Sequence, residues 1–263
     1  MFRLKYFLFI LATSFIFVSC SDDSINKAND IVRCKLLSYT DSANYYYEVE
    51  YKDDQASSLY YYRFDNNEVG DLVRQTEIYR NFLGEITYIN YKDSDGNLNF
   101  VDSVYSNSRG IPYEIVTYNN IGEFVEKVIR VYNNQYQVIT ESNYKYDETW
   151  KLLSQSNYQY DVNDRLIDRQ YQQFNDNGSR SEHSTYEYDN MKNINKIVDL
   201  FTLFNKNNRI KETTTFTSRD SLVTTSIKTF VYDYNEEGYP IKVETSSSSN
   251  ENVSVRFNTI ICD

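Results

Sequence analysis

An aromatic residue followed closely by Asp or Asn recurs at a nearly fixed interval along most of this chain, and this period constrains the fold more than any other feature. From Tyr91 to Tyr188 the interval is 13 or 14 residues; it then rises to 16, and the series continues to Tyr232. A fixed period of this length indicates one supersecondary unit repeated many times. The series consists of Tyr91, Tyr105, Tyr118, Tyr132, Tyr146, Tyr160, Phe174, Tyr188, Phe204 and Tyr232.

Each period divides into a stretch without Gly or Pro and a short segment that favours a turn. In the clearest unit, residues 165–174 are followed by residues 175–178, which read Asn-Asp-Asn-Gly. Asn, Asp and Gly tolerate positive φ, and Asn and Asp side chains bond to nearby backbone, so these residues cluster in hairpin loops. Residues 138–146 alternate between a face that holds Tyr144 and a face that holds Glu141. This period of two indicates a β-strand.

Strands of about ten residues joined by turns of about four residues must be antiparallel neighbours. The sequence therefore predicts an all-β fold, a long antiparallel up-and-down meander of about 12–15 strands with a 14-residue repeat. An open meander of this length would expose two strand edges, and closure would remove them. We expect a barrel or a flattened barrel, and the sequence leaves the choice between the two open.

The first twenty residues have the pattern of a processing signal. Arg3 and Lys5 form a short basic start, residues 6–18 are almost wholly apolar, and a small residue precedes Cys20. An apolar run this short falls below the roughly 20 residues that a membrane helix needs and is typical of a signal-peptide core. Residues 17–20, Phe-Val-Ser-Cys, resemble a bacterial lipobox, in which the cysteine thiol receives diacylglycerol. We therefore expect lipid attachment at Cys20.

These features divide the chain into three parts. We expect a lipoprotein signal peptide at 1–19, the lipidated cysteine and a flexible tether at 20–30, and a single β-repeat domain at 31–263. The Ser-Asp-Asp segment at 21–23 is similar to the export signals of surface lipoproteins in Gram-negative Bacteroidota. The expectation is an outer-membrane lipoprotein exposed at the cell surface, with a periplasm-facing orientation as the alternative.

The charge and the polarity of the strands limit the partners. The formal net charge is −11, and an acidic chain is repelled by phosphate backbones, so we expect no nucleic-acid partner. In the strand predicted at 138–146, Thr140 lies on one face and Glu141 on the other. A membrane-spanning barrel needs an apolar outward band instead. We therefore expect a soluble barrel that the lipid anchor alone holds in the outer membrane.

Cys34 and Cys262 lie near the two ends of the predicted β domain. Outside the cytoplasm the two thiols would form a disulfide if the first and last strands are neighbours. If those strands are not neighbours, both cysteines are simply buried apolar residues. The sequence leaves both possibilities open.

Two kinds of resemblance follow from these motifs. Residues 158–166 and 186–190, which read YQYDVNDRL and YEYDN, resemble the Tyr-Asp repeats of Rhs and teneurin-type shells, which wind long β-sheets around a hollow interior. The lipobox, the Ser-Asp-Asp segment and the Tyr-x-Tyr-Asp units up to Asp233 are similar to small lipoproteins of gut Bacteroidota, from an uncharacterised family with a porin-like fold. This resemblance covers about residues 20–263, implies a porin-like β fold and carries no catalytic residue.

The sequence offers little for catalysis. Its one histidine, His183, excludes a multi-histidine metal site, and we expect it to be a solvent-facing polar strand residue. Asp93 and Asp95 precede Gly96 and form a weak calcium candidate. They stand where the repeat requires a turn, and no bidentate Glu follows at the required spacing, so the turn is the preferred interpretation. Phosphate-binding glycine loops are absent, and we expect no cofactor.

The 27 tyrosines are the strongest hint of function. Their rings either stack on sugars and peptides or fill the core of a glycine-poor sheet. Trp150, the only tryptophan, stands in a predicted turn, where an exposed ring would be a binding anchor and a tucked ring would close the barrel end. The candidate ligand-binding residues are Trp150, Tyr144, Tyr158 and Tyr186.

We expect a non-enzymatic envelope lipoprotein that binds a glycan, a peptide or a partner protein through a Tyr-rich surface or cavity. The alternative is a structural or assembly accessory lipoprotein that packs on another envelope protein. A glycoside hydrolase is the third interpretation, because an acidic chain supplies many carboxylates, although none is distinguished by its local sequence.

Overall fold

The computed structural model describes residues 34–40, 45–65, 68–174, 180–193, 207–218 and 222–262. The chain divides into two units, 1–33 and 34–263, and every described residue belongs to the second unit. The predicted signal peptide, the lipidated Cys20 and the tether therefore lie outside the described residues. Within the described residues, no helix is long and apolar enough to cross a membrane.

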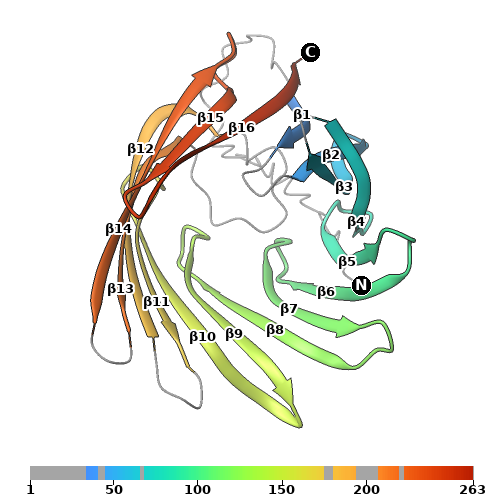
Figure 1. Ribbon diagram of the computed structural model, residues 1–263. Helices are drawn as coiled ribbons and strands as arrows, with labels where there is room; N and C mark the ends of the chain where they lie inside the picture. The colour runs from blue at the N-terminus through green and yellow to red at the C-terminus, as the bar shows by residue number, and fades with distance from the viewer. Residues whose placement is uncertain are drawn as a thin grey trace, which may run out of the picture. The chain divides into compact units, whose positions relative to one another are not determined.

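The described residues form sixteen β-strands, each antiparallel to its neighbours. The strands follow one another in sequence order around a closed barrel, and β16 returns to pair with β1 (Figure 1). The all-β meander is thus confirmed, with one strand more than the predicted range and with closure as a barrel. The strands are β1 (Cys34–Thr40), β2 (Tyr45–Lys52), β3 (Gln55–Asp65), β4 (Glu68–Arg80), β5 (Ile86–Asp93), β6 (Leu98–Ser106), β7 (Pro112–Asn119), β8 (Phe124–Tyr132), β9 (Val138–Asp147), β10 (Thr149–Tyr160), β11 (Leu166–Gln173), β12 (Arg180–Lys192), β13 (Asn207–Thr217), β14 (Val223–Tyr234), β15 (Pro240–Ser247) and β16 (Asn250–Cys262).

Seven turns between the described strands share one hydrogen-bond geometry, in which the first residue is Asn or Asp. In the turn after β10, Asp161 Oδ1 accepts the backbone N–H groups of Asn163 and Arg165, each at 2.9 Å. The fourth residue of these turns has positive φ, and it is Gly in all but two of them, which use Tyr136 and Asp164. The residues that begin the seven turns are Asn81, Asp93, Asn107, Asn119, Asn133, Asp161 and Asn235.

The 14-residue period corresponds to one strand and one turn, but the side-chain contacts repeat only every second strand. Tyr160, at the end of β10, donates its phenol O–H to the carbonyl of Val138 at the start of β9 (2.9 Å). Tyr188 makes the same bond to Leu166 (2.7 Å), two periods later. Tyr146, one period before Tyr160 in the series, instead joins an aromatic cluster. The hairpin is therefore the repeating unit of the structure.

The register separates the two faces of the barrel wall, because ladder partners lie on the same face. Ile89 pairs with Ile78 and is fully buried, and we assign its face to the interior because an outward side chain would meet solvent. Glu77 pairs with Asn90 on the other, outer face. Two apolar clusters occupy the inner face: Val49, Ala56, Leu59, Ile78, Ile86, Ile89 and Val104, and Val138, Tyr158, Leu166 and Tyr186.

The first and last strands close the barrel as neighbours. β1 pairs with β16, and the Cα register places Cys34 opposite Cys262. Cys262 is disulfide-bonded. The sequence predicted a disulfide between these two cysteines on the condition that the first and last strands are neighbours. That condition is met.

Candidate functional site

Three aromatic side chains cluster where β8 and β10 begin. The Trp150 ring meets Tyr146 edge-on, with centroids 5.2 Å apart, and meets Phe124 in the same way at 5.5 Å. Phe124 and Tyr146 lie 5.3 Å apart and are 44% and 36% exposed. We call Phe124, Tyr146 and Trp150 the aromatic platform. It offers exposed ring surface next to a half-buried indole, the combination that binds sugar rings and peptide side chains.

The turn before β10 explains why these rings meet. Trp150 was predicted to stand in a turn, but it is the second residue of β10 and the direct ladder partner of Tyr146. The prediction failed because the turn is shorter than the repeat suggests: Glu148 takes positive φ (58°), and the chain reverses between Asp147 and Thr149. The tight reversal places the two rings side by side.

The register assigns the platform to the outer face. A continuous row of ladder partners connects Tyr144, two residues before Tyr146, to Tyr79 of the outer face. The row consists of Tyr79, Tyr88, Ser103, Val116, Lys127 and Tyr144. The platform therefore lies on the outside of the barrel wall.

Lys127 joins two of the predicted ligand-binding residues. Its Nζ lies 4.7 Å from the centroid of the Trp150 ring and 5.4 Å from that of Tyr144. It also lies 3.9 Å from a carboxylate oxygen of Glu114. The Lys127 side chain is only 17% exposed, so its charge is partly desolvated and strengthens the attraction to the rings. Trp150 and Tyr144 are thus brought together around one cation.

The other two predicted residues, Tyr158 and Tyr186, are placed elsewhere. They are 5% and 8% exposed and pack with Val138 and Leu166 on the inner face. Burial raises the pKa of both phenols. The Tyr186 ring also packs against the guanidinium of Arg209, 4.2 Å from its centroid. These two tyrosines fill the core and present almost no surface to solvent.

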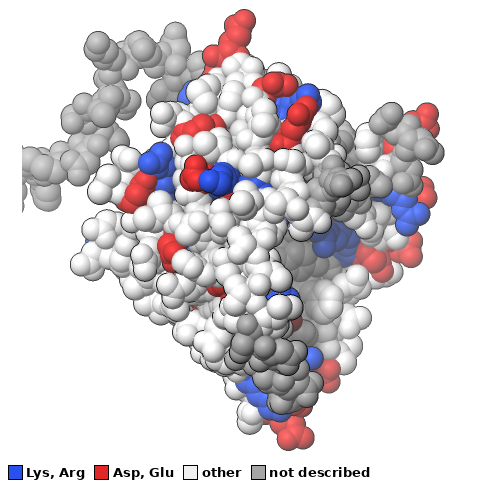
Figure 2. Space-filling model, turned by 60° about the vertical axis from the view of Figure 1, so that its left-hand side comes forward, with Lys and Arg blue, Asp and Glu red and all other residues white. Residues whose placement is uncertain are grey.

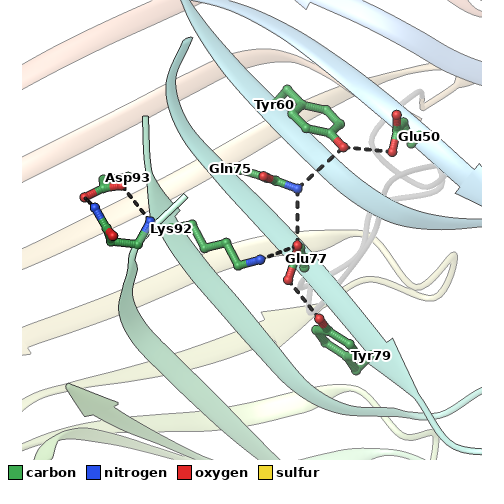
Figure 3. Close-up of polar contacts among 8 residues, drawn as sticks. Glu50, Tyr60, Gln75, Glu77, Tyr79, Lys92 and Asp93 are labelled. Carbon is green, nitrogen blue, oxygen red and sulfur yellow. Dashed lines mark hydrogen bonds and ion pairs between the residues drawn. The ribbon is translucent and has the colours of Figure 1, made fainter. Parts of the chain in front are cut away.

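A second group on the outer face is polar and centres on Glu77 (Figure 3). Glu77 accepts hydrogen bonds from the Tyr79 phenol (2.8 Å), the Lys92 ammonium (2.6 Å) and the Gln75 amide (3.3 Å). The Gln75 amide also reaches the Tyr60 hydroxyl at 3.5 Å. We define the tyrosine–carboxylate network as Glu50, Tyr60, Gln75, Glu77, Tyr79 and Lys92.

The electrostatics of this network determine what it can do. Tyr60 donates to Glu50 (2.9 Å), and burial followed by this bond raises the pKa of Tyr60. Burial acts to raise the pKa of Glu77, but hydrogen bonds from Lys92 and Tyr79 outweigh it and hold the pKa below its ordinary value. Glu77 is therefore a fixed acceptor for hydroxyl groups. The general acid of a glycoside hydrolase needs the opposite, a raised pKa.

A pocket of about 750 Å³ adjoins the network between the β2–β3 and β4–β5 turns. Glu77 and Tyr79 line it together with Ser58 and Arg80. Sequence reasoning missed this region because the 14-residue series is weak upstream of Tyr91. The available signal was the alternation of polar residues with buried ones at 75–79, where Thr76 and Ile78 face inward.

The other residues that the sequence singled out, His183, Asp93 and Asp95, make contacts that hold strands and turns in place. The His183 side chain is 53% exposed, and its ring Nε2 contacts Asp168 on the outer face. Asp93 Oδ1 accepts hydrogen bonds from the backbone N–H groups of Asp95 (3.0 Å) and Asn97 (2.9 Å). This is the geometry of the first residue in the seven turns described above. Among the residues that the structure describes, no three His, Cys, Asp or Glu side chains are grouped to hold a metal ion.

The outer face carries ion pairs at separate places around the wall. On the side shown in Figure 2, basic and acidic side chains lie next to one another in small groups among uncharged residues. The register places four ion pairs on the face opposite to the buried core, whereas Arg130–Glu141 (2.8 Å) lies on the inner face. Outer-face pairs are Lys92–Glu77 (2.6 Å), Lys127–Glu114 (3.9 Å), Lys211–Glu187 (2.7 Å) and Lys242–Glu244 (2.6 Å).

Comparison with known proteins supports the fold of this chain and does not identify its ligand or its activity. No family model and no curated protein matches the sequence. A porin-like protein from Bacteroides uniformis is 11% identical, with a TM-score of 0.55, and the match covers 88% of this chain and 95% of that chain. A porin-like protein from Bacteroides vulgatus is 14% identical, with a TM-score of 0.54 and coverage of 86% and 98%. The chain therefore has a porin-like antiparallel β-barrel.

Proposed function

We propose that this protein is a non-enzymatic lipoprotein of the cell envelope that binds a glycan on the aromatic platform. The observation that carries the proposal is the platform itself: two exposed rings against Trp150, with the Lys127 ammonium 4.7 Å from the indole centroid. Sugars present C–H groups to aromatic faces and hydroxyl groups to charged neighbours.

The test is a glycan-array screen of residues 21–263, purified without lipid. Trp150→Ala is expected to abolish specific binding, because it removes the indole that holds the other two rings in place. The matched control is Tyr113→Ala, which removes an exposed aromatic residue (42%) outside the platform and should bind as the parent does. Equal loss of glycan binding in both variants, or no binding by the parent protein, would contradict the glycan proposal.

Anchoring and location form a second part of the proposal. The lipobox at Cys20 supports a lipid anchor, and the Ser-Asp-Asp segment that follows supports display at the outer surface of the outer membrane. Charged outer-face pairs support a barrel that stands in water, since an outward Lys or Arg at the bilayer midplane costs roughly 2–4 kcal/mol. Intact-mass analysis of the mature N-terminus tests the anchor: an acylated Cys20 is expected, and an unmodified N-terminus at another residue would contradict it.

Two observations support the non-enzymatic part of the proposal. The network has a carboxylate, Glu77, whose pKa is lowered, and a glycosidase acid needs the reverse. The one imidazole, His183, contacts Asp168 on an open strand face and belongs to no recognisable nucleophile motif. Hydrolysis of any glycan that the array identifies would contradict this part.

A second candidate function rests on a different observation. The last strand carries an exposed apolar stripe on its outer face, and such a stripe suits packing against another protein. This favours an assembly role if no ligand is found, and crosslinking in intact cells is the measurement that would show the partner. The stripe consists of Val253, Val255, Phe257 and Ile261, which are 36–57% exposed.

A further inference from the structure

One end of the barrel is defined by where the described chain enters it. Because neighbouring strands alternate in direction, every second turn lies at the same end as Cys34, the first residue of β1. The ladder pairing of Cys34 with Cys262 places the last residue of β16 there too. We call this the entry end. Its described turns are 53–54, 81–84, 107–110, 133–136, 161–164 and 235–238.

The entry end carries large apolar side chains that contribute nothing to the core. Val162 is 97% exposed and Phe82 is 94% exposed, the two highest values among the described large hydrophobic residues, and Leu83 is 66% exposed. Their turns are held by side-chain bonds: Asn81 Oδ1 accepts the backbone N–H of Leu83 (2.9 Å). Apolar tips on stiff turns add nothing to the core, and a surface that covered them would gain the burial of their apolar area.

We propose that these tips, Phe82, Leu83 and Val162, insert into the surface of the bilayer that holds the lipid on Cys20. The inference rests on the proposed lipid anchor. Thirteen residues lie between Cys20 and Cys34 in the sequence, and a chain of that length spans at most about 45 Å when fully extended. The tether joins the barrel at the entry end, so this end can rest on the bilayer without the tether having to run along the barrel wall to the opposite end.

The contact is one-sided. Glu236 and Glu237 occupy the same positions in the turn after β14 that Phe82 and Leu83 occupy in the turn after β4. Carboxylates do not enter the apolar part of a bilayer. The barrel therefore leans on the turns between β4 and β11, with the exposed Asp164 next to Val162 kept among the lipid headgroups. The aromatic platform, where β8 and β10 begin, lies at the far end and stays open to large ligands.

The test places a fluorescent reporter on single turns. Trp150→Phe removes the native tryptophan, and Phe82→Trp or Val162→Trp is added to it. The matched control is Ile121→Trp, because Ile121 is 72% exposed in a turn of the same geometry at the opposite end. Residues 21–263 with an N-terminal hexahistidine tag are captured on vesicles of phosphatidylcholine with a nickel-chelating lipid, so that the anchor is supplied by the experiment.

The expected result is a blue shift of emission and quenching by brominated phosphatidylcholine for the reporters at 82 and 162, with no change at 121. Equal quenching at all three positions, or none at any, would overturn the proposal. Because the tag replaces the natural lipid, a negative result counts against the apolar tips alone. The proposed lipidation of Cys20 is tested separately by the mass of the mature protein. Glycan binding is tested separately by the glycan array.

Discussion

The pairing of Cys34 with Cys262 predicts a large effect on stability. A disulfide between them would close a loop of about 230 residues, from the first strand to the last. Directly opposed residues of antiparallel strands have Cα atoms about 4.5–5.5 Å apart, within the range that disulfides span. In the chain-entropy model, a loop of this size stabilises the folded state by about 5 kcal/mol through the unfolded state.

The perturbation is Cys262→Ser in residues 21–263, which contain no other cysteine than Cys34 and Cys262. The assay is urea unfolding followed by intrinsic fluorescence, with and without a reductant. With an m value of about 3 kcal/mol/M, the loss of about 5 kcal/mol lowers the midpoint by roughly 1.7 M. Reduction of the parent should lower its midpoint to that of Cys262→Ser.

Two outcomes would refute this reasoning. If reduction leaves the midpoint of the parent unchanged while Cys262→Ser lowers it, the effect is one of packing at Cys262 and not of a crosslink. If peptide mapping without reductant finds no Cys34–Cys262 peptide, the covalent closure itself is absent. A change in m on reduction is expected in addition, because the crosslink makes the unfolded chain more compact.

Three further predictions follow from the tyrosines and the turns. Tyr160→Phe removes a half-buried hydrogen bond to a backbone carbonyl and should lower the free energy of unfolding by about 1 kcal/mol in urea. Tyr146→Phe keeps its ring contacts and should change that free energy by less than about 0.5 kcal/mol. Equal losses in the two variants would contradict the distinction. Burial raises the pKa of Tyr232 to about 12. The stability that its protonated phenol contributes is therefore complete below the pKa of about 10 in the unfolded chain and is lost as the pH rises through 12. Absorbance at 295 nm should show the inner tyrosines ionising only with unfolding. Asp164→Gly relieves a φ of 63° that Gly adopts without strain, but it also removes the hydrogen bond from the Gln137 amide to Asp164 Oδ1 (3.0 Å). We therefore expect the free energy of unfolding to rise by less than roughly 1 kcal/mol, and a lower urea midpoint would contradict that.

Local physics made much of the fold predictable. The turn that begins at Asn133 could be expected because Asn accepts the backbone N–H groups of the residues that follow, and the accepted groups are those of Gln135 and Gln137. Alternation in the strand that holds Tyr144 predicted extended structure for the same local reason. Closure is different in kind, since the β1–β16 pairing joins segments at opposite ends of the domain. No local pattern encodes that contact.

The candidate site shows where sequence reasoning fails. The segments 144–147 and 158–161 both read Tyr-x-Tyr-Asp, and the sequence treats them alike. The structure sends Tyr144 to the outer face and Tyr158 to the core. The cause is a register shift in β10 between Leu152 and Ser154, which moves the rest of the strand to the other face. One extra residue in a strand thus decides which tyrosines are available to a ligand.

We propose that this porin-like barrel stands in water and does not span a bilayer, because ion pairs lie on its outer face. The most direct measurement is size-exclusion chromatography of residues 21–263 without detergent, together with conductance across planar lipid bilayers. The account predicts a single soluble species and no conductance steps. Precipitation without detergent, together with stepwise conductance after reconstitution, would contradict it.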